Sequence, residues 1–137
     1  MRVLACLLLA GLGLLGQSAT LTVNVKGFNS DKGSAMAALY DDAGAYPTKE
    51  AKSKDKQMVK IVQGVAVFTF KGVAPGTYAV AVYHDENGNG KMDTNFIGIP
   101  KERTGASNDA KGKMGPPKFQ DAKFVVNGDL TISIAMQ

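Results

Sequence analysis

Short segments in which apolar and polar residues alternate recur along most of the chain after residue 19. In the first of them, Leu21, Val23 and Val25 alternate with polar residues, which is the pattern of a strand with one buried face. Similar segments span residues 34–40, 58–62, 65–70 and 78–83, and turns rich in Gly, Asn, Asp or Pro separate them. Segments 123–126 and 130–136 flank Asn127-Gly128 and are expected to form a terminal hairpin. The pattern therefore predicts an all-β protein, an antiparallel β-sandwich of about seven strands.

One long segment interrupts this pattern. The alternation stops after Asp93 and returns only near Ala122. A loop of such length in a small domain is usually either functional or disordered. Phe96, Ile97, Ile99 and Phe119 are the apolar side chains expected to anchor it. We expect stretch 94–121 to be one ordered loop that the preceding segment holds in place, without strands of its own.

The segment from Phe70 to Tyr78 reads F-x-G-V-x-P-G-x-Y. Pro-Gly forms a tight turn because Pro presets one backbone dihedral and Gly accepts a positive one. The signature resembles transthyretin-like and carboxypeptidase-regulatory-like β-sandwich modules, in which the tyrosine packs at a sheet corner. An immunoglobulin-like or transthyretin-like sandwich is therefore the expected architecture.

The N-terminal residues differ in character from the rest. Met1-Arg2 is followed by an apolar run from Val3 to Leu15, and Ala19 is a small residue suited to cleavage. This is the layout of a secretory signal peptide, and the run is too short for a transmembrane anchor. The expected organisation is a signal peptide over 1–19 and one domain over 20–137, in the periplasm or secreted. The alternative is a buried N-terminal helix.

Cysteine content and charge narrow the function classes. The single cysteine, Cys6, lies in the expected signal peptide, so the exported domain would hold neither a disulfide nor a thiol catalyst. The net charge of +4 comes mainly from lysines, many of them in the segment 49–60. No interleaved aromatic residues or nucleic-acid reader motif accompany them, so no nucleic-acid partner is expected. A solvated loop is the simpler interpretation, and weak attraction to anionic envelope surfaces is the alternative.

The segment from Asp85 to Asp93 carries the strongest chemical signal. It reads D-x-N-x-N-G-x-x-D directly after an apolar strand pattern. Oxygen side chains at alternate positions can turn toward one hard cation, and Gly90 permits the sharp turn of such a loop. Because position twelve is Phe96 and no helices flank the loop, it is not an EF-hand.

The ligands expected to bind calcium combine charged and neutral oxygen atoms. They are the carboxylates of Asp85 and Asp93, the amide oxygens of Asn87 and Asn89, and the main-chain oxygen of Lys91. A further oxygen would come from Glu102, Asp109 or Asp121, which the sequence does not rank. Extracellular sites of this kind bind calcium at roughly 10⁻⁴ to 10⁻³ M. The alternative is a polar Asn-Gly turn that binds no metal.

His84 is the only histidine in the chain. A histidine zinc cluster is therefore excluded, and no nucleophile-elbow motif supports a Ser-His-Asp triad. We interpret His84 as a structural residue whose hydrogen bonds are satisfied. A pair of acidic residues acting as in glycosidases remains open on sequence alone.

Several longer segments together are similar to a bacterial family called domain of unknown function 2141. They are residues 76–82, the run His84-Asp85-Glu86-Asn87-Gly88-Asn89-Gly90-Lys91-Met92-Asp93, residues 98–102, and residues 115–122. The resemblance covers the whole expected domain and implies a small exported β-sandwich, with no implied activity. This chain has Ala106 before Ser107-Asn108, where the family tends to have an aromatic residue.

The function expected from these observations is non-enzymatic. The chain is interpreted as an exported β-sandwich with a calcium loop, which presents a binding surface to an envelope protein or polymer whose identity the sequence does not give. An envelope hydrolase acting from the long loop, or a purely structural module, is the alternative.

Overall fold

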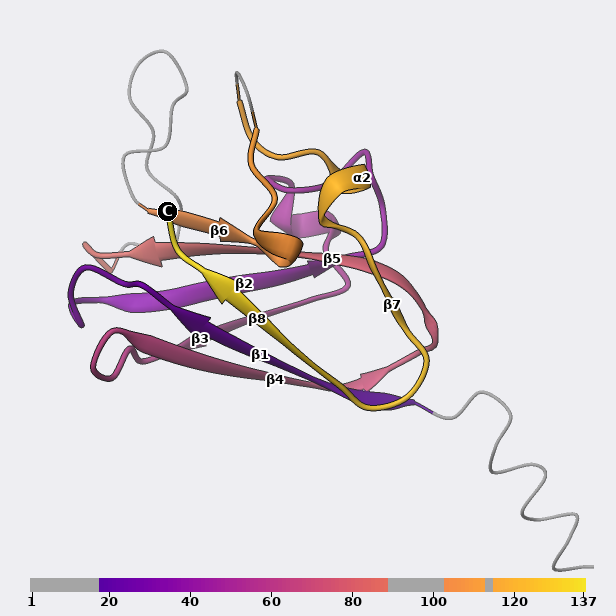
Figure 1. Ribbon diagram of the computed structural model, residues 1–137, viewed down its shortest axis with the longest axis horizontal. Coiled ribbons are helices and arrows are strands. Elements are labelled where there is room, and N and C mark those ends of the chain that lie inside the picture. Colours follow the sequence, from indigo (N-terminus) through magenta and orange to yellow (C-terminus); the bar gives the residue numbers. More distant parts are fainter. Residues whose placement is uncertain (1–17, 89–102, 113–114) are drawn as a thin grey trace, which may run out of the picture.

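The computed structural model describes residues 18–88, 103–112 and 115–137. Within these residues the chain forms two stacked β-sheets, and α2 lies above the sheet that contains β2 and β5 (Figure 1). The elements are β1 (Ala19–Lys26), β2 (Ser34–Tyr40), η1 (Glu50–Lys52), β3 (Asp55–Val59), β4 (Val65–Val73), β5 (Gly76–Asp85), β6 (Thr104–Ala106), η2 (Ser107–Asp109), α2 (Phe119–Ala122), β7 (Phe124–Val126) and β8 (Leu130–Ala135). The predicted all-β sandwich is confirmed.

The order of the strands within each sheet differs from their order along the chain. One sheet has the order β4-β1-β8, and the other has the order β3-β2-β5-β6, with β7 also paired to β5. The β1–β8 pair is parallel and the other pairs are antiparallel. The central strands β1 and β5 therefore join segments that are far apart in the sequence.

The main core lies between the two sheets. The alternating residues Leu21, Val23 and Val25 of β1 are completely buried, as their spacing predicts. Phe68 and Phe70 of β4 are completely buried as well, in the same cluster. Facing residues from β2 and β5 complete this layer, so the two apolar sheet faces bury each other.

A second cluster covers the opposite face of the β2–β5 sheet. Ala38, Tyr40 and Ala79 point away from the main core and pack beneath Tyr46 and Phe119. The rings of Tyr40 and Tyr46 meet edge-on at 5.4 Å, and those of Tyr46 and Phe119 at 5.9 Å. Because both faces are covered, every residue of β2 from Ala35 to Tyr40 is buried. Phe119 is thus an anchor, as predicted, whereas Phe96, Ile97 and Ile99 lie outside the described residues.

The predicted terminal hairpin is wrong. β7 pairs with β5 in one sheet, whereas β8 pairs with β1 in the other, so the Asn127-Gly128 turn carries the chain between sheets. The expectation that 94–121 lacks strands is also wrong, because β6 pairs with Ala81, Val82 and Tyr83 of β5. Three-residue strands carry too little periodicity to be recognised from sequence.

Two predicted turns are present. Gln63 and Gly64 have φ angles of 52° and 77° and connect Val62 to Val65, while the Asp31 carboxylate accepts hydrogen bonds from both of their N–H groups. The Tyr78 hydroxyl donates a 2.7 Å hydrogen bond to the Ala74 carbonyl, four residues upstream. This bond fastens the β4–β5 turn to the start of β5.

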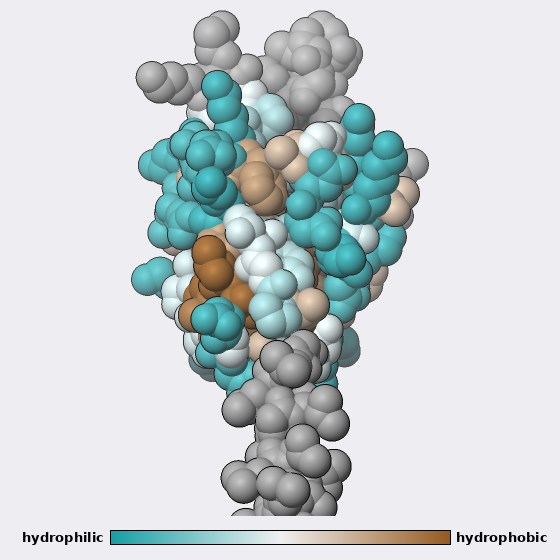
Figure 2. All heavy atoms as spheres, turned by 90° about the vertical axis from the view of Figure 1, so that its right-hand side faces the viewer, coloured by the Kyte–Doolittle hydropathy of each residue, from teal (hydrophilic) through white to brown (hydrophobic). Residues whose placement is uncertain are grey.

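The surface is mainly polar. Figure 2 views the right-hand end of Figure 1 and shows hydrophilic side chains around a small hydrophobic area. Exposed apolar side chains in the described regions include Met58, Val62, Val65, Val67 and Val125. None of the described helices combines the length and hydropathy of a membrane span. Most of the predicted signal peptide, residues 1–17, lies outside the described residues.

Candidate functional site

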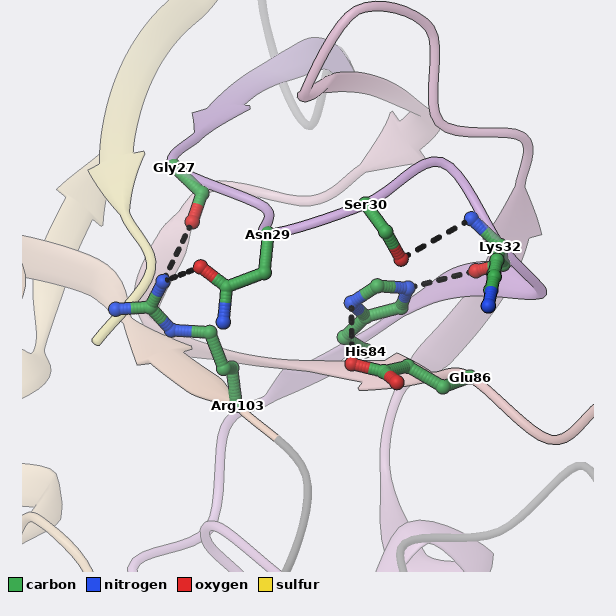
Figure 3. Close-up of polar contacts among 7 residues, drawn as sticks. All are labelled: Gly27, Asn29, Ser30, Lys32, His84, Glu86 and Arg103. Carbon is green, nitrogen blue, oxygen red and sulfur yellow. Dashed lines mark hydrogen bonds and ion pairs between the residues drawn. The ribbon is translucent and has the colours of Figure 1, made fainter.

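The predicted calcium loop begins where three segments meet at one end of the sandwich. They are the β1–β2 turn (27–33), the end of β5 with the residues that follow it (84–88), and Arg103 just before β6. Figure 3 shows His84 and Arg103 directed toward the β1–β2 turn. His84, just before the predicted loop, and Arg103, after it, therefore both contact the β1–β2 turn.

Asp85 is the last residue of β5 and pairs with Ser34 of β2. Its side chain is completely buried, which is unusual for a carboxylate. Since side chains alternate along a strand, it lies on the opposite face of the sheet from His84. A buried carboxylate needs hydrogen-bond donors or a cation beside it, because burial of an ionised carboxylate without compensation costs far more than burial of a neutral polar group.

The backbone around Asp85 is closely packed. Gly33 has φ +66°, and an ideally placed Cβ on it would lie 1.9 Å from the Asp85 carbonyl oxygen and 2.8 Å from that of Glu86. Only glycine leaves room for this approach. The β1–β2 turn therefore fixes the backbone from which the predicted loop departs.

The predicted ligands divide between described and undescribed residues. Asp85 and Asn87 are described, and Asn87 is exposed two residues after the buried Asp85. Asn89, Lys91 and Asp93 lie outside the described residues. Over the described part of the chain, no three His, Cys, Asp or Glu side chains form a group suited to a metal ion.

Of the three residues considered for a further ligand, Asp109 has a structural contact. Its Oδ1 accepts a 2.9 Å hydrogen bond from the backbone N–H of Ala135, which ties η2 to β8. Asp121 lies in α2, and Glu102 is outside the described residues. The structure thus gives Asp109 a role in holding the edge of β8.

His84 is buried, but only one of its ring nitrogens has a hydrogen-bond partner. Nε2 lies 2.7 Å from the carbonyl oxygen of Lys32, and the ring meets Phe28 edge-on at 5.2 Å. Nδ1 is buried without a hydrogen-bond partner among the described residues, and the nearest Glu86 carboxylate oxygen is 3.6 Å away. The prediction of a structural histidine is correct for Nε2 only.

Arg103 was not singled out by the sequence analysis. Its Nη1 donates hydrogen bonds to the Gly27 carbonyl, at 3.2 Å, and to the Asn29 side-chain oxygen. Its own carbonyl accepts a 3.0 Å bond from the backbone N–H of His84. Arg103 therefore holds the β1–β2 turn beside the end of β5, and no local sequence pattern announces that role.

Ser107 and Asn108 connect elements behind the site. The buried Ser107 hydroxyl accepts a bond from the Val80 N–H at 2.9 Å and donates to the Ala122 carbonyl at 2.6 Å. The Asn108 side-chain amide donates to the Lys123 carbonyl at 2.8 Å. These polar residues therefore join β5, η2 and the end of α2. This structural role could not be predicted from the sequence, because both residues follow a segment without a regular hydrophobic pattern.

The comparisons with known proteins give a family but no annotated relative. No curated protein and no solved structure matches the chain. A family model described as an uncharacterized protein conserved in bacteria (DUF2141) matches residues 23–133, which run from within β1 to within β8. Because this match covers most of the chain, the protein is a member of the DUF2141 family.

Proposed function

We propose that this protein is an exported, non-enzymatic β-sandwich whose segment 85–93 binds calcium, and that the loop end of the sandwich presents a binding surface in the cell envelope. The observation that carries the proposal is the complete burial of Asp85 at the point where β5 ends and the D-x-N-x-N-G-x-x-D sequence begins. The strand end would supply a fixed first ligand, and the residues that follow it in the sequence would supply the others.

The chemistry of the segment favours calcium over other cations. Its candidate ligands are carboxylate, amide and main-chain oxygens, which suit a hard cation that accepts six to eight oxygen atoms. Mg²⁺ demands a smaller and more regular shell and keeps most of its water molecules. Two carboxylates among neutral oxygens correspond to a weak, extracellular type of site, with a dissociation constant of roughly 10⁻⁴ to 10⁻³ M.

Cleavage after Ala19 is compatible with the start of the fold. β1 begins at Ala19, so cleavage after Ala19 would leave the strand almost intact. The backbone nitrogen of Thr20 already lies 2.9 Å from the Asp129 Oδ1 atom. In a mature chain that begins at Thr20, this nitrogen would be an ammonium group, and its hydrogen bond to the carboxylate would be charge-assisted.

The proposed binding surface is supported by the contacts that hold both ends of the loop region in place. Glu86 lies beside His84, and Arg103 is hydrogen-bonded to the β1–β2 turn. A cation bound by segment 85–93 would therefore order a backbone whose neighbouring residues are already held in place. A partner or polymer that recognises this end would then bind more tightly with calcium present. Comparison of envelope material retained by the immobilised protein in calcium and in chelator tests this part of the proposal.

Thermal unfolding tests calcium binding itself. A ligand that binds only the folded state at ten times its dissociation constant stabilises the protein by about 1.4 kcal/mol. The melting temperature of the wild type should therefore rise in about 10 mM calcium relative to chelator, by about 6 °C. Asp85→Asn and, separately, Asp93→Asn should remove this rise.

Asp42→Asn is the matched control. Asp42 follows the other end of β2 and uses Oδ1 to accept a bond from the Gly44 N–H, which asparagine can also accept. This variant should keep the full calcium response. A wild-type melting temperature that is the same in calcium and chelator would contradict the proposal, and so would an unchanged response in both loop variants.

A further inference from the structure

The tautomer of His84 is fixed by its surroundings. Nε2 lies 2.7 Å from the Lys32 carbonyl oxygen, and a carbonyl can only accept a hydrogen bond. Nε2 therefore carries a hydrogen. The edge-on contact with Phe28 and complete burial keep the ring in this orientation.

The other ring nitrogen faces a second acceptor. With the hydrogen on Nε2, a neutral ring has a lone pair on Nδ1, and this atom has no hydrogen-bond partner in the described structure. A Glu86 carboxylate oxygen lies 3.6 Å away, which is beyond hydrogen-bond length (Figure 3). In that state the buried Nδ1 lone pair is directed toward a carboxylate oxygen, an arrangement that a cation bound to both atoms would stabilise.

The arrangement has the features of a metal-binding histidine. Histidine ligands commonly donate their second ring N–H to a backbone carbonyl, which fixes the tautomer and the ring orientation, as Lys32 does here. Zinc binds nitrogen and carboxylate oxygen at about 2.0–2.2 Å, so two ligands of a tetrahedral ion lie roughly 3.4 Å apart. The observed 3.6 Å between Nδ1 and the Glu86 oxygen is close to that spacing.

We propose that His84 Nδ1 and the Glu86 carboxylate bind a divalent transition-metal ion such as zinc. The His84 side chain is completely buried and the Glu86 side chain is 46% exposed, so the ion would lie at the boundary between the protein interior and solvent. An imidazole nitrogen suits zinc, nickel or copper and does not suit calcium, which takes oxygen ligands. Glu86 belongs to segment 85–93 but is not one of the proposed calcium ligands, and Asp85 leaves β5 on the opposite face from His84. The two proposed sites therefore use different side chains.

Nitrogen NMR of the imidazole ring tests the site directly, because the chain contains one histidine and its signals need no further assignment. Titration of the purified protein with zinc chloride should shift the Nδ1 signal in a saturable way and affect Nε2 less. Excess calcium chloride should not reproduce the shift. Imidazole signals that stay unchanged up to millimolar zinc would overturn the proposal.

Two variants separate ligand loss from unfolding. Glu86→Gln changes a half-exposed side chain and should weaken zinc binding at least about tenfold. Glu50→Gln, on the surface helix η1, is the matched control and should bind zinc as the wild type does. His84→Gln keeps an amide donor for the Lys32 carbonyl but lacks Nδ1, so calorimetry should detect no zinc binding to it. Equal zinc affinities for the wild type and Glu86→Gln would contradict the assignment.

Discussion

Replacement of Gly33 by alanine tests the close approach between the β1–β2 turn and the start of the predicted loop. An alanine Cβ would lie 1.9 Å from the Asp85 carbonyl oxygen, so one of the two backbones has to move. The residue also has φ +66°, where an L side chain costs about 1 kcal/mol. Overlap with a neighbouring backbone adds about 1–3 kcal/mol. We therefore expect Gly33→Ala to lower the free energy of unfolding by about 2–4 kcal/mol.

Gly72→Ala supplies the matched control for this substitution. Gly72 has a nearly identical φ of +71°, but among the described residues no heavy atom other than those of its chain neighbours lies within 4 Å of its ideal Cβ position. This variant should incur only the conformational cost of about 1 kcal/mol. The difference between the two variants therefore isolates the steric contact with Asp85.

Differential scanning calorimetry of the purified variants measures this difference. For a domain of this size, 1 kcal/mol corresponds to about 4 °C, so Gly72→Ala should lower the melting temperature by about 4 °C and Gly33→Ala by about 8–16 °C. Gly33→Ala should also weaken calcium binding, because it displaces the backbone of Asp85. Equal losses of stability in the two variants would refute the claim that the turn fixes the start of the loop.

Three further predictions concern the polar and ionisable groups around the sandwich. Ser107→Ala leaves the Val80 N–H and the Ala122 carbonyl without their buried partner. Urea denaturation should therefore show that the free energy of unfolding falls by about 2–4 kcal/mol. A decrease below about 0.5 kcal/mol would contradict the bridging role. Burial, with a smaller effect of the nearby Glu50 charge, raises the pKa of Tyr40 from 10.0 to about 12. The folded state therefore holds this proton more tightly, and the resulting stability is fully present below pH 10 and is lost as the pH rises toward 12, which denaturation at several alkaline pH values should reveal. Stability that is constant over that range would contradict this assignment. N-terminal sequencing of the exported protein should begin within a few residues of Thr20, and an intact Met1 on the folded protein would contradict cleavage.

The parts of the fold that sequence predicted depend on neighbouring residues in the chain. Leu21, Val23 and Val25 alternate because β1 has one face in the main core, and the same holds for β4. Gln63-Gly64 forms its predicted turn because Gly64 readily adopts the positive φ angle that the turn requires. Such features need no knowledge of distant segments.

The parts that sequence missed depend on contacts across long separations. Segment 34–40 was predicted as a strand, but the burial of its second face was not, because that face is covered by Tyr46 and Phe119 from other parts of the chain. β8 has an ordinary strand pattern, but nothing in that pattern indicates a parallel partner, β1, more than a hundred residues away. Local periodicity identifies a strand and its buried face, whereas the neighbouring strand with which it pairs depends on how the whole chain packs.

In the candidate site as well, features of neighbouring residues could be predicted from the sequence, whereas contacts between distant segments could not. The spacing of oxygen side chains identified Asp85 as the first residue of the loop, and the structure places it at a buried strand end. Gly33 and Arg103 act on that strand end from other segments, and an isolated glycine or arginine in a sequence does not reveal such a contact. The unpaired Nδ1 of His84 also became evident only with the position of Lys32.

Calcium binding by segment 85–93 is the central claim, and amide NMR of the isotope-labelled protein tests it most directly. Stepwise addition of calcium to chelator-treated protein should move the signals of residues 85–93 most and reach half-saturation at roughly 10⁻⁴ to 10⁻³ M. The neighbouring Gly33 signal should follow them, because its backbone lies against Asp85. In Asp85→Asn these signals should remain in place over the same titration. A wild-type spectrum that stays unchanged up to about 10 mM calcium, ten times the upper end of that range, would contradict the account.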